Sequence, residues 1–446
     1  MDFRVALSKL LYESAISQTY LKLQKSQWLS TQELCNLQQE RLKKLLIHAK
    51  TFVPYYQSKI NNFYEESAIN DTLIRLPILS RELLQENMMN LCDERTGIRH
   101  KSCVKSSGTT GMAVQVFLDK DSIDYSRSLR KRGDYEWTNV SFNSKRVFLT
   151  TRRSIKKYSL QRLGEIIRRN WRLNIFNHET CTYLNGIDLE PVINKLIRFN
   201  PAVITGNASG IHRIAEFCIE NKLKPLNLEA VISISEVLSE RTKQMAERAF
   251  GCRIYNQYGS SEFGTIAAEC PNGKLHINAE RFIVEILKDG LPVPDGEEGE
   301  IVITDLINHG FPLIRYATGD IGIIGTTPCS CGRKLPVIEK ILGRTIDYIP
   351  TPSGEKVYAN YIDHLIYKHF SNREIKQAQL LQTALNHLVI RIVPGPKYQS
   401  DFDGKIINVV KRAFYNGEMD LSLDFSNQIL ISKTGKFQFY HRCFNN

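Results

Sequence analysis

The chain has 446 residues, of which 42% are hydrophobic and 24% charged, as is usual for a globular protein of two or three domains. No apolar run approaches the roughly 18 residues that a membrane span needs, and charged residues interrupt the N-terminal stretch, so we expect a cytoplasmic protein without a signal peptide. The net charge of +12 favours anionic partners, although a basic surface alone would also account for it.

The first predicted element is a helix at residues 30–50. Ser30 and Glu33 have the spacing of a capping box, and apolar residues follow at helical intervals. Pro54 cannot continue the helix, because it lacks a backbone N–H and clashes with the preceding turn. We therefore expect the helix to end just before it.

The middle of the chain alternates short apolar runs with amphipathic ones. The strand-like runs are 147–151, 202–206, 228–235 and 253–259, and the helix-like runs are 189–200, 209–222 and 239–251. This alternation predicts βαβ units and a parallel sheet. Ligands of such sheets lie at the carboxyl ends of the strands, so the loops after Gly206, Ser235 and Tyr258 are candidate binding loops.

From about residue 275 the pattern changes to hairpins and antiparallel strands, and a final segment of about 100 residues mixes strand and helix signals. We therefore predict an α/β protein with two domains. The N-terminal domain, 1–342, holds the parallel sheet and a β-rich part at 265–342, and a small α+β domain follows at 343–446.

The segment SSGTTG at 106–111 is unusual, because it is rich in hydroxyls and glycine and cannot fill a core. Backbone N–H groups near glycine, together with Ser and Thr hydroxyls, form concavities that bind anions such as phosphate. The segment lacks the Gly-Lys-Ser/Thr ending of the common nucleotide loop, and no helix signal follows it. Alone, such a segment is more often an ordinary turn.

Four further motifs follow in order: QYGSSEFG at 257–264, PLIRYATGD at 312–320, GRTIDYI at 343–349 and SKTGKFQ at 432–438. With SSGTTG they resemble the motif set of the adenylate-forming superfamily. Within it, the chain is similar to the phenylacetate–coenzyme A ligase family, and in particular to its CapK-type branch from capsule and O-antigen gene clusters. The resemblance covers nearly the whole chain and implies a large N-terminal domain with a small mobile C-terminal lid.

The resemblance also implies a nucleotide site. The residues it assigns to ATP or AMP are Ser106, Ser107, Gly108, Thr109, Thr110, Gly111, Ser235, Glu236, Tyr258, Gly259, Ser260, Ser261, Asp320 and Arg344. In this assignment the loop at 106–111 holds the phosphates, Tyr258 and the Ser235–Glu236 turn line the adenine, and Asp320 binds the ribose hydroxyls.

Three implied roles concern catalysis. Glu262 would hold Mg²⁺ against the phosphates, since a hard cation takes oxygen ligands. Lys436 would steady charge on the α-phosphate during attack by a carboxylate, with Thr109 also in the catalytic set. Asp347 would be the hinge of the small domain. The sequence contains no convincing Ser-His-Asp or Cys-His nucleophile set.

Ten cysteines in 446 residues suit a reducing compartment, but four residues suggest a metal site. Cys270, His276, Cys329 and Cys331 together would make a closed tetrahedral zinc site. Several members of the resembled family carry structural zinc at a similar pattern. The alternative is a set of buried free thiols, because the sequence does not show that the two halves meet.

The leading hypothesis is an ATP-dependent ligase that forms an acyl-adenylate from a carboxylic or amino acid. The acceptor is either coenzyme A or an amine such as an amino sugar, since the segment after the hinge, YIPTPSGEKVYANYID, departs from the usual coenzyme A ligase pattern. A basic zinc-containing nucleic-acid-binding protein and a non-catalytic interaction protein are the alternatives. No RNA-binding, finger or helix-turn-helix pattern supports the first, so we expect no nucleic-acid partner.

Overall fold

The computed structural model describes most of the chain. The described residues are 18–60, 73–95, 102–105, 114–141, 144–150, 172–176, 189–344, 348–354, 356–371, 373–414, 417–425, 429–430 and 438–444. Within these ranges no helix combines the length and the apolar character that are needed to cross a membrane.

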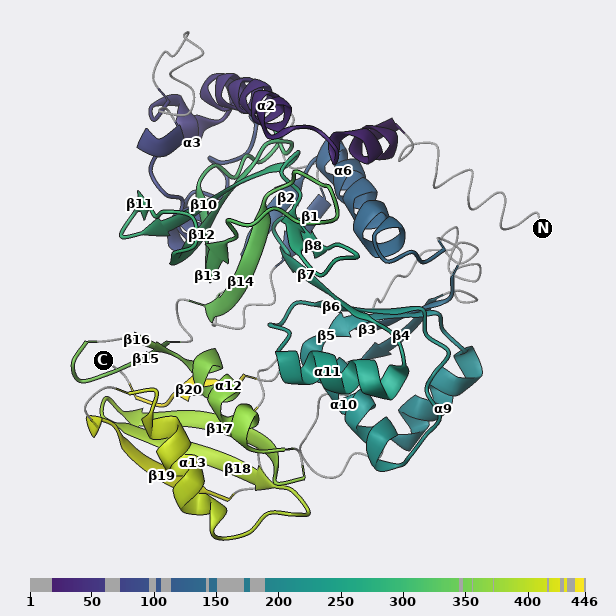
Figure 1. Cartoon of the computed structure of the whole chain (residues 1–446). Helices are drawn as coiled ribbons and strands as arrows, with labels where there is room; N and C mark the ends of the chain where they lie inside the picture. The colour runs from purple at the N-terminus through teal and green to yellow at the C-terminus, as the bar shows by residue number, and fades with distance from the viewer. Residues whose placement is uncertain are drawn as a thin grey trace.

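The N-terminal part consists of helices around a β-rich core (Figure 1). Its elements are α2 (Thr31–Phe52), α3 (Pro54–Gln57), α5 (Arg81–Glu86), β1 (Ser102–Lys105), β2 (Gln115–Leu118), α6 (Lys120–Lys131) and the π-helical turn η2 (Arg132–Glu136). The capping box predicted for α2 is present, with both the Ser30 and the Glu33 side chains hydrogen-bonded to backbone N–H groups. The helix α2 ends at Phe52, before Pro54, as the sequence predicted, and Pro54 then begins the short helix α3.

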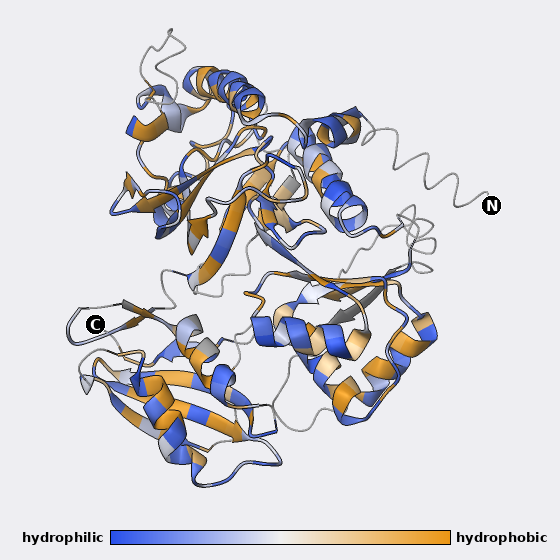
Figure 2. Ribbon diagram, viewed as in Figure 1, coloured by the Kyte–Doolittle hydropathy of each residue, from blue (hydrophilic) through white to orange (hydrophobic). Residues whose placement is uncertain are grey.

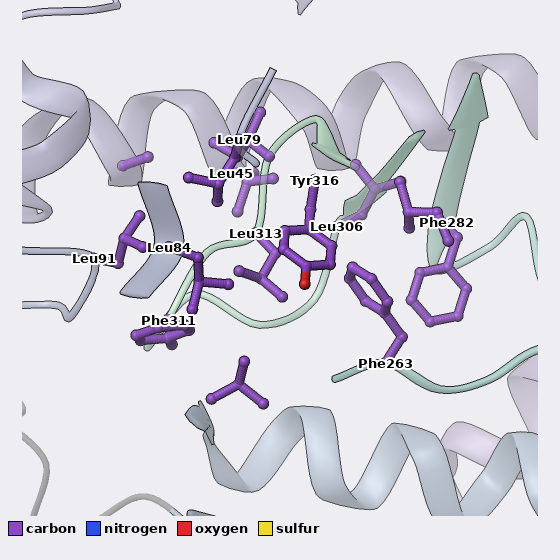
Figure 3. Close-up of a cluster of buried hydrophobic side chains, with 14 of the residues drawn as sticks. Leu45, Leu79, Leu84, Leu91, Phe263, Phe282, Leu306, Phe311, Leu313 and Tyr316 are labelled. Carbon is purple, nitrogen blue, oxygen red and sulfur yellow. The ribbon is translucent and has the colours of Figure 1, made fainter. Parts of the chain in front are cut away.

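The main core of this part lies between α2, α5 and the antiparallel strands. Figure 3 shows Leu45 close to Tyr316, and Leu84 close to Phe311 and Leu313. The Phe263 ring packs edge-on against the rings of Phe282 and Tyr316. Burying large apolar side chains in this way is the dominant stabilising term of a fold.

The parallel part follows. Its elements are β3 (Arg146–Thr150), β4 (Arg172–Phe176), α9 (Glu190–Phe199), β5 (Val203–Asn207), α10 (Ala208–Glu220), β6 (Ala230–Ile234), α11 (Glu240–Phe250) and β7 (Ile254–Ser260). The strands β4, β3, β5, β6 and β7 pair in parallel in that order. The predicted βαβ units are confirmed, and a second core joins the three helices to one face of this sheet. Figure 2 shows apolar and polar positions alternating along the same helices.

The antiparallel strands extend the same sheet instead of forming a separate one. They are β8 (Gly264–Glu269), β9 (Leu275–Ile277), β10 (Phe282–Lys288), β11 (Leu291–Pro292), β12 (Glu298–Asp305), β13 (Tyr316–Ile324) and β14 (Val337–Arg344). Because β7 is parallel to β6 and antiparallel to β8, it joins both halves into one 12-stranded sheet. Antiparallel pairing therefore begins at β8, earlier than the change in pattern near residue 275.

The C-terminal segment has its own sheet and core. Its elements are β15 (Tyr348–Pro350), β16 (Lys356–Tyr358), α12 (Ala359–His369), β17 (Ile375–Ala384), β18 (His387–Pro394), α13 (Phe402–Lys411), β19 (Asp420–Asp424) and β20 (Tyr440–Arg442). Four strands pair in the order β19-β18-β17-β20. The buried apolar residues of this segment, from Ile349 to Tyr440, form one cluster among themselves.

Several arginines that contribute to the positive net charge are internal. Arg132, within the basic run LRKRG, is fully buried in η2 and contacts both carboxylate oxygens of Glu280, at 2.6 and 3.1 Å. Burial alone would raise the pKa of Glu280, but the charge and hydrogen bonds of Arg132 hold it below its ordinary value. This basic run is therefore partly structural, and is not simply a surface for anions.

Glu280→Gln should lower the free energy of unfolding by about 3 kcal/mol, because it leaves the Arg132 guanidinium buried without a counter-charge. Urea denaturation of the full chain measures this. Glu297→Gln, at an exposed position, is the matched control and should change little. Equal stability of the two variants would contradict a structural role for the pair.

Candidate functional site

A cleft of about 2220 Å³ lies between the large sheet and the C-terminal segment. It is lined by residues at and beyond the carboxyl ends of β6 and β7, by the first turns of α11, by β14, and by residues of α12. Figure 1 shows α12 below β14 and beside α11 at this place. Six of the residues predicted to bind nucleotide line it: Ser235, Glu236, Tyr258, Gly259, Asp320 and Arg344.

Tyr258, Asp320 and Arg344 come from three strands and meet at one wall of the cleft. The Tyr258 hydroxyl donates to Asp320 Oδ2 at 2.8 Å, and Arg344 Nε lies 3.5 Å from Asp320 Oδ1. Asp320 and Arg344 are paired across β13 and β14. Burial, followed by the charge of Asp320, raises the pKa of Tyr258 well above its ordinary value. The phenol therefore stays a hydrogen-bond donor, and the carboxylate can accept from further hydroxyls in the cleft.

The Ser235–Glu236 turn follows β6. Ser235 has φ 68°, a conformation that non-glycine residues rarely adopt and that often occurs at functional sites. Glu236 accepts hydrogen bonds from Asn207 Nδ2 at 3.0 Å and from the backbone N–H of Ser209 at 2.8 Å. It thus ties the end of β6 to the first turn of α10, which fixes the backbone that borders the cleft.

The turn between β7 and β8 holds the remaining residues of the YGSSE motif. At Gly259 a side chain would clash with the backbone of Gly264, so this close approach of the two strands requires glycine. Glu262 is only 6% exposed, and its charge contributes to a raised pKa of Tyr316, for which burial is the larger cause. Ser260, Ser261 and Glu262 are not among the described residues that line the cleft.

The four predicted metal ligands do come together. Cys270 follows β8, His276 lies in β9, and Cys329 and Cys331 lie in the turn between β13 and β14. Their ligand atoms are all within 4.8 Å of one another. The sheet itself brings the two halves together, because Val337 of β14 pairs with His276 of β9.

The geometry of this Cys/His cluster fits zinc. Cys270 Sγ lies 3.6 Å from Cys329 Sγ, and Cys331 Sγ lies 3.3 Å from His276 Nε2. Ligands on a tetrahedron with bonds of 2.0–2.3 Å are separated by roughly 3.3–3.8 Å. His276 Nδ1 is 2.9 Å from the carbonyl oxygen of Leu335. A carbonyl only accepts, so Nδ1 carries the proton and Nε2 presents its lone pair to the cluster, as in many zinc sites.

No protein-family model matches the chain, but individual relatives do. CapK of Staphylococcus aureus is 23% identical over 422 residues, covering 91% of this chain and 89% of CapK. A phenylacetate–coenzyme A ligase of Thermus thermophilus is 25% identical over 362 residues, covering 76% of each chain.

The fold agrees with these similarities. A 2-hydroxyisobutyryl-CoA ligase in its postadenylation state, complexed with an acyl-AMP, matches with a TM-score of 0.72 at 16% identity, covering 93% of this chain and 90% of that one. The phenylacetate–coenzyme A ligase and the 2-hydroxyisobutyryl-CoA ligase are AMP-forming ligases of the adenylate-forming superfamily, and the chain is similar to the first in sequence and to the second in fold. Other states of the 2-hydroxyisobutyryl-CoA ligase match with lower TM-scores, 0.57 for an open conformation and 0.56 for the thioesterification state.

Several of the predicted site residues lie outside the described part of the chain. They are Ser106, Ser107, Gly108, Thr109, Thr110, Gly111, Asp347 and Lys436. The strands on either side of the loop at 106–111 are described: β1 pairs with β2, with Lys105 opposite Gln115. The sequence shows no helix signal after this loop, and the next described element is the strand β2.

Sequence reasoning missed the residues that the C-terminal segment contributes to the cleft. They include Tyr358, Tyr361, Asp363 and Tyr367. Burial raises the pKa of Asp363 to about 6, and the charge of nearby Arg241 partly opposes the shift. These positions carry no motif, because they are ordinary residues of one amphipathic helix and its N-cap. Only the packing of α12 beside α11 shows that they matter.

Proposed function

We propose that this chain activates a carboxylic or amino acid with ATP, forming an acyl-adenylate and pyrophosphate, and then transfers the acyl group to coenzyme A or to an amine such as an amino sugar. The observation that carries the proposal is the cleft in which Tyr258, Asp320 and Arg344 meet from separate motifs. Similarity to CapK and to phenylacetate–coenzyme A ligases supports it, and the former favours a role in surface polysaccharide synthesis.

In the first step a carboxylate oxygen of the acid bonds to the α-phosphorus of ATP, and the bond from that phosphorus to pyrophosphate breaks. Asp320 would accept hydrogen bonds from the ribose hydroxyls, and Arg344 would donate to ribose or phosphate. Lys436 would neutralise charge that develops on the α-phosphate. Mg²⁺ would neutralise charge on the phosphates, with the Glu262 carboxylate as one of its oxygen ligands.

In the second step the acceptor's thiolate or amine attacks the acyl carbonyl carbon. The bond from this carbon to the AMP oxygen breaks, and the acceptor's proton passes to solvent. The first step therefore requires that the protein holds the phosphates of ATP. The second step requires space for the acceptor next to the acyl carbon. A cleft between two movable parts serves both needs.

We further propose that the Cys/His cluster binds one structural zinc ion per chain. Four protein ligands leave no open coordination position, so the ion would have no catalytic role. It would join the β8–β9 turn to the β13–β14 turn, next to β14, which carries Arg344 to the cleft.

The proposal predicts pyrophosphate release that depends on one acid or a small class of acids. The assay is a panel of carboxylic and amino acids with purified protein, ATP and Mg²⁺, run with and without coenzyme A. If coenzyme A stimulates turnover, the enzyme forms a thioester. If only amines or amino sugars stimulate turnover, the enzyme forms an amide. Absence of pyrophosphate release with every acid and acceptor would contradict the proposed reaction.

A further inference from the structure

Arg241, in the first turn of α11, reaches from the large sheet's layer to α12 of the C-terminal segment. Its guanidinium carbon lies 3.5 Å from the centre of the Tyr367 ring, and it also hydrogen-bonds the Tyr367 hydroxyl. The same hydroxyl accepts from the backbone N–H of Ala378 at 2.8 Å. Tyr367 is thus held by its own domain and presents a fixed aromatic face to the arginine, an arrangement that favours a cation–π contact.

Asp363 lies one helical turn before Tyr367 on α12, so both side chains share a face. It lines the cleft and interacts electrostatically with Arg241. The arginine therefore meets both an aromatic ring and a carboxylate from the other part of the chain. Without Arg241, this carboxylate would lose its nearby positive charge.

A second contact between the same two parts lies at the start of α12. The hydroxyl of Tyr358, the N-cap residue of the helix, hydrogen-bonds Glu298 of β12. Burial raises the pKa of Tyr358 to about 12, and the charge of Glu298 adds to the shift. The phenol therefore remains the donor and the carboxylate the acceptor across neutral pH.

These contacts belong to one particular placement of the C-terminal segment. The TM-score to the 2-hydroxyisobutyryl-CoA ligase is higher for its postadenylation state, 0.72, than for its thioesterification state, 0.56. Both structures are of the same named ligase and cover 93% of this chain. The difference therefore reflects how its parts are arranged, and this chain matches the postadenylation arrangement better.

We propose that Arg241 is a positioning residue that selects between the two half-reactions. Through Tyr367 and Asp363 it favours the arrangement that matches the postadenylation state, in which the adenylate is held, over the arrangement in which the acyl group is transferred. This inference rests on the proposed function. A contact present in only one of two arrangements shifts their equilibrium by its own interaction energy, and by no more.

Arg241→Ala should lower the rate of adenylate formation relative to acyl transfer by about 3- to 30-fold, the range expected for losing one such contact. Adenylate formation is measured by ATP–pyrophosphate exchange with the acid that the panel identifies, and transfer by supplying the chemically prepared adenylate. The matched control is Arg248→Ala, which also removes one positive charge from α11. Arg248 is exposed, and it borders the cleft as Arg241 does. It should leave the ratio unchanged.

Two further variants protect the test against simple misfolding. Arg241→Lys keeps the charge near Asp363 but not the flat guanidinium, so it should restore the ratio in part. Tyr358→Phe removes the second contact without touching Arg241 and should shift the ratio in the same direction. If Arg241→Ala and Arg248→Ala give the same ratio, Arg241 has no positioning role.

Small-angle X-ray scattering of the full chain separates this inference from the proposed function, because it needs no substrate. Arg241→Ala should change the scattering profile toward a more open particle, while Arg248→Ala should match the wild type. If the profile of Arg241→Ala changes but no acid supports pyrophosphate exchange, the proposed reaction is wrong. The effect of the Arg241 contact on domain placement would still be confirmed. An unchanged profile for Arg241→Ala would overturn the inference even in an active enzyme.

Discussion

Lys436→Ala should slow adenylate formation by about 10²-fold or more, because one preorganised positive charge is removed from the point where charge develops on the α-phosphate. Transfer of the acyl group from a supplied adenylate should be slowed much less, because that step does not form the charged phosphorus centre. Pyrophosphate exchange and single-turnover transfer measure the two steps separately. Their ratio is therefore the quantity that identifies the role of Lys436.

The chain supplies a close control for this experiment. Lys433 lies three residues before Lys436 in the same SKTGKFQ segment, so Lys433→Ala removes one positive charge from a neighbouring position in the sequence. It should leave both half-reactions close to the wild-type rates. Equal losses in both steps for Lys436→Ala would instead indicate misfolding or a shared binding role.

Of the changes considered, removal of zinc from the Cys/His cluster should lower the free energy of unfolding the most. Structural zinc sites contribute on the order of 10 kcal/mol of binding free energy, which is lost when the ion is chelated. Cys331→Ser should abolish stoichiometric zinc and lower the thermal unfolding temperature, since one of four ligands is lost. Metal analysis of the purified protein and thermal unfolding with and without chelator give the two measurements.

Cys35→Ser is the matched control, because Cys35 is half-buried like Cys331 but lies in α2, outside the cluster. It should keep its zinc and nearly all of its stability. Purified wild-type protein without zinc, or a Cys331→Ser variant as stable as Cys35→Ser, would contradict the structural-zinc proposal. Buried free thiols would then be the better description of the cluster.

Local signals predicted the elements well, because they depend on residues close together in the chain. The capping box of α2 needs only Ser30 and Glu33, and the helices and strands from β5 to β7 follow from their apolar periodicity. The joining of parallel and antiparallel halves at β7 was not predicted. A strand can pair in parallel along one edge and antiparallel along the other. The sequence of the strand itself does not determine which strands it pairs with.

The site was predictable only as far as its residues lie in motifs. Resemblance to the adenylate-forming superfamily identified Tyr258 and Asp320, but their direct hydrogen bond depends on the packing of strands far apart in sequence. Similarly, nothing in the sequence marks Arg132 as buried, because only the fold reveals Glu280 beside it. Arg241 and Tyr367 carried no signal at all, since an interdomain contact needs no motif.

The nucleotide product tests the central proposal most directly. Full-length wild-type protein is incubated with ATP, Mg²⁺, the acid that the panel identifies and its acceptor, and the products are separated by anion-exchange chromatography. Attack on the α-phosphorus predicts AMP and pyrophosphate in equal amounts, each matching the acyl product formed. ADP and inorganic phosphate in stoichiometry with the acyl product would show attack at the γ-phosphorus and contradict the proposed reaction.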